Sequence, residues 1–91
     1  LIKIIRKNKS KLPELSYTSK LFKKGKVKIA NKVGEESTET ITAFLSQGKK
    51  EIAEESADLI FHLFVLLEYS GVSPDDVFDV LFDRMNNEKK N

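Results

Sequence analysis

Cysteine and tryptophan are absent from this 91-residue sequence, and it contains only two prolines, four glycines and one histidine. Without cysteine the chain has no disulfide bond, no thiolate metal site and no cysteine nucleophile. A glycine-rich phosphate loop and a Ser-His-Asp arrangement are also missing. The Glu-x-x-His pairs of carboxylate-bridged di-iron bundles do not occur either. These absences exclude the common thiol, serine-hydrolase, P-loop and di-iron classes.

Long apolar runs are missing as well. The longest, residues 59–67, is interrupted by His62 and is far shorter than the ~20 residues that a membrane span requires. The first residues interleave charged with apolar side chains, and no small-residue cleavage site follows, so a secretory signal is not indicated. We therefore expect a cytoplasmic protein without a membrane partner.

The length predicts a single domain over residues 1–91, since a typical domain has roughly 100 to 150 residues. A folded monomer of this size hides only about 60 to 65% of the surface that its unfolded chain exposes, so its stability margin is narrow. With no disulfide and no thiolate metal site to add stability, oligomerisation is the expected solution.

Charge is distributed unevenly along the chain. Residues 1–32 hold eleven of the sixteen Lys and Arg and one acid, whereas residues 33–91 hold five basic and thirteen acidic residues. This asymmetry indicates either a basic arm for nucleic acid or a site in which lysines hold phosphates and carboxylates hold a cation.

Glycine and proline separate stretches that all have helical periodicity, so the predicted fold is all-α, a bundle of about four to five helices. Ile29, Ala30, Val33, Ile41 and Phe44 are expected on one apolar face of the second long stretch. Gly48 is expected as a left-handed cap, and Gly34 as a point where a neighbouring helix approaches closely. The expected helices cover residues 1–10, 16–24, 26–47 and 49–70, and a last one begins with Ser73 as N-cap and Pro74 as first residue, before a frayed polar tail over residues 86–91.

Two pairs of acids stand out. Glu36 and Glu39 are three residues apart, as are Glu55 and Asp58, so each pair projects from one face of its helix. If the two helices pack antiparallel across residues 47–49, the four carboxylates meet at one point. Such a site, made of oxygen ligands alone, suits Mg²⁺ or Mn²⁺.

The same spacing also fits a solvated charged face, because Glu51 with Glu54 repeats it in this charged sequence. Like charges at this spacing repel each other, however, and Glu55 and Asp58 adjoin an apolar part of their helix. Acids at the margin of a core need a partner, and a divalent cation is one.

Lysines and the single histidine complete the candidate site. Lys32 shares a helix face with Glu36, so it either pairs with that acid or grips substrate phosphates. His62 follows Asp58 by one turn, and we expect it to be a hydrogen-bonded neighbour of the site or a core residue rather than a ligand. Tyr17 and Phe22 are expected in the core or stacked on a base. The candidate phosphate-binding residues are Lys20, Lys24, Lys28 and Lys32.

Several segments resemble the phosphoribosyl-ATP pyrophosphohydrolases of histidine biosynthesis, which are all-α, MazG-like nucleotide pyrophosphohydrolases. The resemblance extends from about residue 16 to 85 and rests on Ser-Tyr-Thr at 16–18, Lys-Ile-Ala-Asn-Lys-Val-Gly-Glu-Glu-Ser-Thr-Glu at 28–39, and Glu-Ser-Ala-Asp-Leu-Ile-Phe-His-Leu at 55–63. Phe61 departs from the tyrosine expected beside the histidine. The resemblance implies Glu36, Glu39, Glu55 and Asp58 as Mg²⁺ ligands, with Glu35 supporting the site or positioning the water.

The implied activity is hydrolysis of 1-(5-phosphoribosyl)-ATP to 1-(5-phosphoribosyl)-AMP and pyrophosphate. The metal would make a water more acidic, and lysines would stabilise the departing pyrophosphate. One alternative is a house-cleaning pyrophosphohydrolase of the same fold, acting on other nucleotides. A non-enzymatic module that binds nucleic acid through residues 3–32 is another, although it leaves the carboxylate pairs unexplained.

Residues 59–67 also predict a homodimer. This part of the helix is apolar on every side except at His62, so it needs burial on every side, and three short neighbours in one chain can hardly cover it. A second copy would complete the bundle by two-fold symmetry. The family resemblance implies dimers too.

Overall fold

The computed structural model describes residues 1, 5 and 17–90, and four helices account for nearly all of the described chain. In chain order they are α2 (Tyr17–Lys24), α3 (Lys26–Ser46), α4 (Lys49–Ser70) and α5 (Pro74–Lys90). Residues 17–90 contain no strand, which confirms the all-α prediction. The helix expected over residues 1–10 and the cap expected at Ser16 lie outside the described residues, apart from Leu1 and Ile5.

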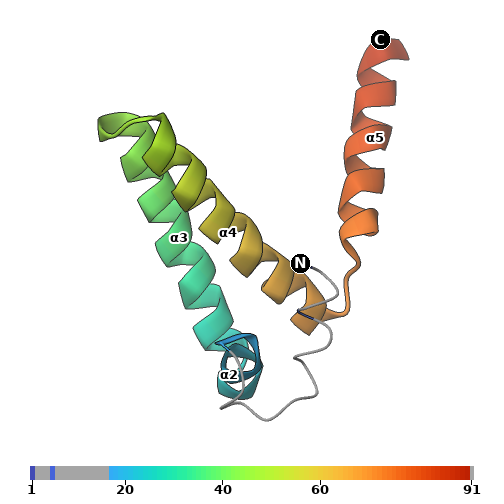
Figure 1. Ribbon diagram of the computed structural model, residues 1–91. Helices are drawn as coiled ribbons and strands as arrows, with labels where there is room; N and C mark the ends of the chain where they lie inside the picture. The colour runs from blue at the N-terminus through green and yellow to red at the C-terminus, as the bar shows by residue number, and fades with distance from the viewer. Residues whose placement is uncertain (2–4, 6–16, 91) are drawn as a thin grey trace.

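The long helices α3 and α4 form an antiparallel hairpin, and α2 packs at the N-terminal end of α3 (Figure 1). The turn at residues 47–49 joins the hairpin as expected, but Gly48 is not a left-handed cap. Its φ of −105° is ordinary extended backbone, and it serves as the N-cap of α4, donating its N–H to the Glu51 carboxylate (3.1 Å). A left-handed residue is unnecessary here because Gln47 closes α3 by donating its own N–H to the Ala43 carbonyl.

Other helix ends follow the sequence more closely. Gly25 and Gly71 have φ of 91° and 72°, values that favour glycine, and they end α2 and α4. Ser73 caps α5 by accepting a hydrogen bond from the Asp75 N–H (3.2 Å). The prediction of a frayed tail over residues 86–91 is wrong, because α5 continues to Lys90.

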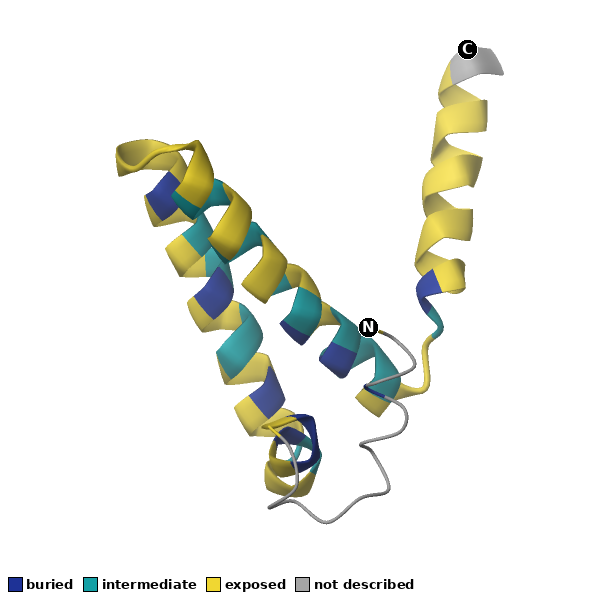
Figure 2. Ribbon diagram, viewed as in Figure 1, coloured by how far each residue is buried: buried dark blue, intermediate teal, exposed yellow. Residues whose placement is uncertain are grey.

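A small core lies where α2, α3 and α4 meet. Its fully buried members are Ile5, Leu21, Ile29 and Val65, and Phe22, Phe61, Phe64 and Leu66 pack against them. Figure 2 shows that buried residues are confined to this region, to the facing sides of α3 and α4, and to the start of α5. Counting the described residues alone, this core is small for the length of the helices.

Helix α5 stands apart from the hairpin, and every residue from 75 to 88 is exposed (Figure 2). Val77, Phe78, Val80, Leu81, Phe82 and Met85 are therefore large apolar side chains in contact with solvent. The expected apolar face of α3 is also only partly buried, since Ile29 is 3% exposed but Ile41 and Phe44 are 58% and 71% exposed. None of the described helices is long and apolar enough to cross a membrane.

Candidate functional site

The buried stripe of α3 carries polar residues in the middle of its packing face. Ile29, Val33, Glu36, Thr40 and Ala43 recur at alternating spacings of four and three, and all are buried or half-buried. This spacing places them along the side of α3 that packs on α4. Helix packing thus brings the carboxylate of Glu36 and the hydroxyl of Thr40 into the space between two helices.

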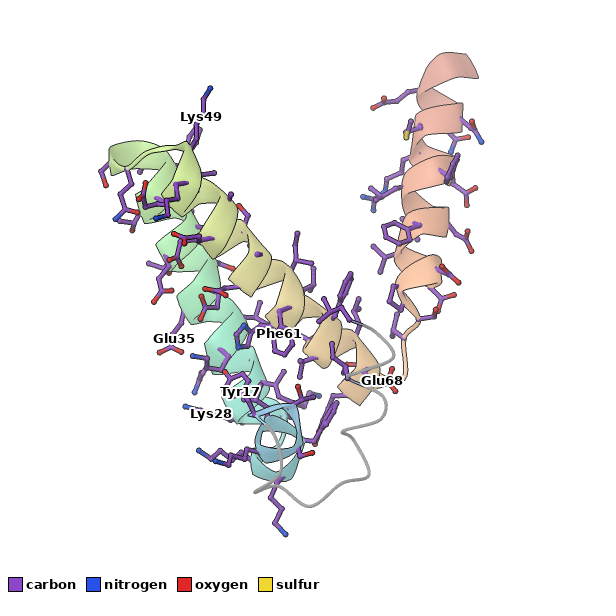
Figure 3. The ribbon with its side chains drawn as sticks, in the orientation of Figure 1. Tyr17, Lys28, Glu35, Lys49, Phe61 and Glu68 are labelled. Atoms are coloured by element: carbon purple, nitrogen blue, oxygen red, sulfur yellow. The ribbon has the colours of Figure 1, made fainter. Side chains whose placement is uncertain are left out.

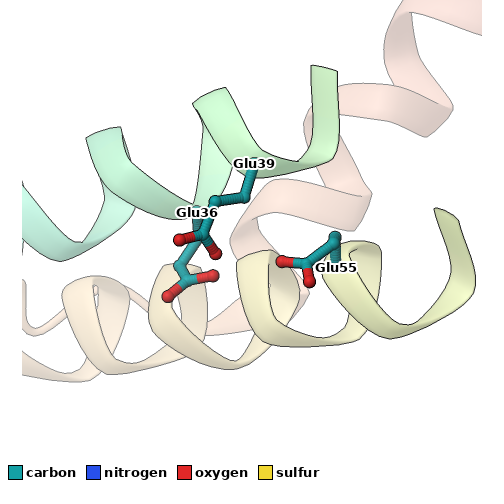
Figure 4. A group of neighbouring side chains, drawn as sticks. All are labelled: Glu36, Glu39 and Glu55. Atoms are coloured by element: carbon teal, nitrogen blue, oxygen red, sulfur yellow. The ribbon is translucent and has the colours of Figure 1, made fainter. Parts of the chain in front are cut away.

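Three carboxylates converge at this level of the hairpin. Glu36 and Glu39 of α3 and Glu55 of α4 each place an oxygen within 4.8 Å of the other two (Figure 4). Glu36 is 7% exposed, Glu55 is half-buried and Glu39 is exposed, so the group opens to solvent on one side. Oε2 of Glu36 and Oε2 of Glu55 are buried and accept no hydrogen bond.

The electrostatics of the group is unfavourable for the bare carboxylates. Burial raises the pKa of Glu36, and the nearby carboxyl of Glu39 raises it further. For Glu55 the contact with Glu39 is the main cause of a raised pKa, followed by burial and the charges of Asp58 and Glu36. Two buried carboxylate oxygens without donors, facing further acids, are unfavourable as anions unless a proton or a cation lies between them. The donor set fits a hard divalent cation.

Asp58 is the one expected ligand that is not part of this three-membered group. It lies on α4 one turn after Glu55, is exposed, and is close enough for its charge to raise the pKa of Glu55. Asp58 therefore flanks the group from the solvent side. No side-chain contact of Asp58 with Glu36 or Glu39 is recorded among the described residues.

His62 has both ring nitrogens engaged. Its Nδ1 lies 2.7 Å from the Asp58 carbonyl oxygen, which can only accept, so Nδ1 carries the proton and donates. Its Nε2 lies 2.7 Å from the hydroxyl of Tyr17, which donates to it when the imidazole is neutral. Both ring nitrogens of His62 are thus engaged; the sequence predicted either a hydrogen-bonded neighbour of the acids or a core residue, and His62 is buried and bonded to the backbone of Asp58.

Tyr17 links α2 to this histidine, and the sequence predicted only part of its role. Its ring stacks on Phe61 with a centroid distance of 6.2 Å, which fits the expected packing role. It is nevertheless 48% exposed, and its hydroxyl was not predicted to bind His62. Phe61 lacks the hydroxyl that a tyrosine would place beside His62, and Tyr17 of α2 brings a hydroxyl to this histidine.

Lys32 approaches the acids directly. Its Nζ lies 3.2 Å from Glu35 and 3.7 Å from Glu36, so the expected pairing with Glu36 is present. Hydrogen bonding to Glu35 raises the pKa of Lys32. Lys20 and Lys24 on α2 and Lys28 on α3 are exposed. Figure 3 shows Lys28 and Glu35 projecting from the outer side of α3, away from α4.

Two further observations revise or extend the sequence analysis. Gly34 does not mark a close approach of another helix among the described residues, because a Cβ at this position would meet nothing within 4 Å beyond its chain neighbours and the backbone of its own helix. Thr40 was not singled out, yet its hydroxyl contacts the backbone of both helices beside the carboxylates. The signal that points to Thr40 is its place in the spacing of four and three that also contains Glu36.

A comparison with known protein families matches residues 1–85 to the model of phosphoribosyl-ATP pyrophosphohydrolase. Among curated proteins, the phosphoribosyl-ATP pyrophosphatase of Sulfurisphaera tokodaii is 53% identical over 85 residues, covering 93% of this chain and 90% of the relative. That of Metallosphaera sedula is 50% identical over 82 residues, or 90% of this chain and 88% of the relative. The chain also matches 43% of the histidine biosynthesis bifunctional protein HisIE of Thermotoga maritima, at 46% identity.

Proposed function

The chain belongs to the phosphoribosyl-ATP pyrophosphohydrolase family, and on that basis we propose that it hydrolyses 1-(5-phosphoribosyl)-ATP with the help of a divalent cation held between α3 and α4. The products are 1-(5-phosphoribosyl)-AMP and pyrophosphate, in the second step of histidine biosynthesis. Water adds to phosphorus while the anhydride bond between the α- and β-phosphates breaks. The chain is thus a hydrolase of a phosphoric anhydride.

One observation supports the cation above all others. Glu36 is only 7% exposed, and its Oε2 has no hydrogen-bond partner. Oε2 of Glu55, on the facing helix, is also buried without a partner. We assign Glu36, Glu39, Glu55 and Asp58 as the residues that hold Mg²⁺, with Mn²⁺ as a possible substitute. When bound, the cation supplies charge that neutralises the triphosphate and makes a nearby water more acidic.

The remaining residues have separable tasks. Glu35 is exposed beside the buried group and pairs with Lys32, so it supports the site or orients the attacking water. Lys32 is positioned to bind phosphate oxygens at the edge of the carboxylates, and charge-assisted hydrogen bonds of this kind stabilise a leaving pyrophosphate. Lys20, Lys24 and Lys28 add positive charge from the exposed surfaces of α2 and α3.

A pyrophosphate-release assay tests the substrate. Phosphoribosyl-ATP is compared with ATP, dUTP and dCTP, each with Mg²⁺ and with a chelator in its place. Efficient release from phosphoribosyl-ATP alone, dependent on Mg²⁺, is the expected result. Preference for dUTP or dCTP would instead favour a house-cleaning pyrophosphohydrolase of the same fold, and chelator-resistant turnover would contradict the cation.

We also propose that the protein is a homodimer. Along α4 and α5, Ile60, Leu63, Phe64, Leu67, Val77 and Phe78 line an open apolar groove of about 260 Å³. Apolar side chains are also exposed along α5 and at the C-terminal end of α3. They are too many to be scattered single surface residues. A second copy of the chain presents the same helices and would cover both by two-fold symmetry.

A further inference from the structure

Thr40 connects the two helices at the level of the carboxylates. Its hydroxyl oxygen lies 2.7 Å from the Glu36 carbonyl oxygen on α3 and 3.1 Å from the Glu55 carbonyl oxygen on α4. The hydroxyl carries one proton, which is shared between two acceptors in a three-centre arrangement. The two carbonyls belong to the residues whose Oε2 atoms are buried without partners.

Other threonines of α3 do not make this connection. The hydroxyl of Thr38 donates to the Gly34 carbonyl (3.1 Å) and that of Thr42 to the Thr38 carbonyl (3.0 Å), and both residues are exposed. These bonds remain within α3 and constrain only its own backbone. Among the bonds from side chains of α3 to backbone carbonyls in the described residues, that of Thr40 is the one that reaches α4.

The position of this bond has a physical consequence. Glu36 and Glu39 from one helix and Glu55 from the other repel each other when ionised, and their repulsion acts to separate the helices where Thr40 joins them. A hydroxyl that holds the two backbones together keeps the carboxylate oxygens at a fixed separation before a cation arrives. Preorganisation of this kind strengthens metal binding because less reorganisation accompanies it.

We propose that Thr40 is a positioning residue for the cation site, whose hydroxyl fixes the α3–α4 spacing at Glu36 and Glu55. The inference rests on the proposed function, since it concerns the same carboxylates. Thr40 does not touch substrate or cation in this assignment and acts through the backbone of the two ligand-bearing turns. Outer groups that orient metal ligands typically contribute 10- to 100-fold to metal affinity.

The test measures Mn²⁺ binding to the full chain by electron paramagnetic resonance of free Mn²⁺, without substrate. Thr40→Val keeps the branched shape and removes the donor, so roughly 10- to 100-fold weaker binding is expected. Thr40→Ser keeps the donor and should bind close to wild type. Thr42→Val removes an intrahelical bond of the same kind and should leave binding unchanged. Turnover of Thr40→Val should recover at high Mg²⁺, which a general loss of structure would not allow.

The outcomes separate this inference from the cation proposal. Wild-type affinity in Thr40→Val, or an equal loss in Thr40→Ser and Thr40→Val, would overturn the role of the hydroxyl while leaving the carboxylate site intact. If Thr40→Val fails to fold, the serine variant still decides the question, because a large loss of affinity there contradicts the inference. Binding by Glu36→Gln as tight as wild type would instead refute the cation site itself.

Discussion

At the scale of single residues, the central feature is a carboxylate in a packing position. Glu36 occupies a place in the helix interface that an apolar side chain would normally fill, and its neighbours on the stripe are Val33 and Thr40. Leaving a buried carboxylate oxygen without a donor costs free energy unless a cation or a proton is present. The buried carboxylate therefore lowers the stability of the fold locally, and binding of a cation would offset this cost.

The four assigned ligands predict a common loss of function. Glu36→Gln, Glu39→Gln, Glu55→Gln and Asp58→Asn should each abolish Mg²⁺-dependent turnover while helical content is retained, because a neutral amide keeps the shape but lacks the charge that holds the metal. Pyrophosphate release and circular dichroism check this. Near-normal turnover in two of the four variants would refute the assignment.

A second prediction at this scale concerns Lys32. Its Nζ lies beside Glu35 and Glu36, so Lys32→Ala should raise KM or lower kcat for phosphoribosyl-ATP by roughly tenfold, the loss expected of one charge-assisted hydrogen bond of about 1.4 kcal/mol. Lys89→Ala near the end of α5 is the matched control and should leave turnover unchanged. Equal effects of the two substitutions would show that the lysines act only as a diffuse field.

At the scale of elements, α3 and α4 pack through apolar side chains near α2 and carry like charges on their facing sides further along. Ile29 and Val65 are buried at one end of the hairpin, whereas Glu36, Glu39 and Glu55 oppose each other nearer the middle. Burial chiefly raises the pKa of Glu36, the contact with Glu39 chiefly raises that of Glu55, and the neighbouring acids add to both shifts. The proposed cation between the helices would replace this repulsion with attraction.

The hairpin should therefore be stabilised by metal. Mg²⁺ at about 100 times its dissociation constant is expected to add about 2.7 kcal/mol, which corresponds to a rise in Tm of roughly 10 °C or more at fixed protein concentration. Glu36→Gln should lose this response. Glu54→Gln, which alters an exposed acid next to Glu55, should keep it. Thermal unfolding with Mg²⁺ and with a chelator measures both, and an identical Tm in the two conditions for wild type would contradict the prediction.

Tyr17 is one of the residues that attach α2 to α4. Tyr17→Phe retains the stacking on Phe61 and removes the hydrogen bond to His62, so a loss of about 0.5 to 1 kcal/mol in unfolding free energy is expected. Nitrogen chemical shifts of His62 should report the change at Nε2, while the bond from Nδ1 to the Asp58 carbonyl persists. Unchanged shifts would show that the hydroxyl does not engage the ring in solution.

At the scale of the whole molecule, a single copy covers too little of its apolar surface. The exposed fractions of Phe44, Leu45 and Phe82 are 71%, 73% and 64%, and no other helix of the described residues packs along α5. Burying such side chains contributes about 1.5 to 3 kcal/mol each, which favours association strongly for a 10.4 kDa chain. In Figure 1, α5 projects away from the α3–α4 hairpin, an arrangement that fits the proposed homodimer.

Sedimentation equilibrium at micromolar concentration tests this directly, and a species of twice the chain mass is expected. Phe82→Asp should shift the equilibrium toward monomer and reduce stability, because it places a charge in the apolar surface. Asp79→Asn, also exposed on α5, is the control and should leave the dimer intact. A well-folded and active monomer of wild-type protein would overturn the proposal.

The sequence alone determined the helices and the identity of the acids. Periodicity, glycine and the Ser73 cap are local signals, so the hairpin, the ends at Gly25 and Gly71 and the start of α5 were predictable from neighbouring residues. The paired acids at a spacing of three were visible for the same reason. Local signals also misled, since the polar end of α5 looked frayed and is helical.

Only the tertiary structure decided which face of α3 is buried and what lies beside the acids. The apolar residues Ile41 and Phe44 suggested one face, but the packed face runs through Glu36 and Thr40 and leaves those two exposed. Contacts between residues far apart in the chain, such as Tyr17 with His62 and Thr40 with the Glu55 carbonyl, depend on how helices cross and leave no periodic pattern in sequence. Periodicity describes one helix at a time, whereas the site is a property of two helices and the distance between them.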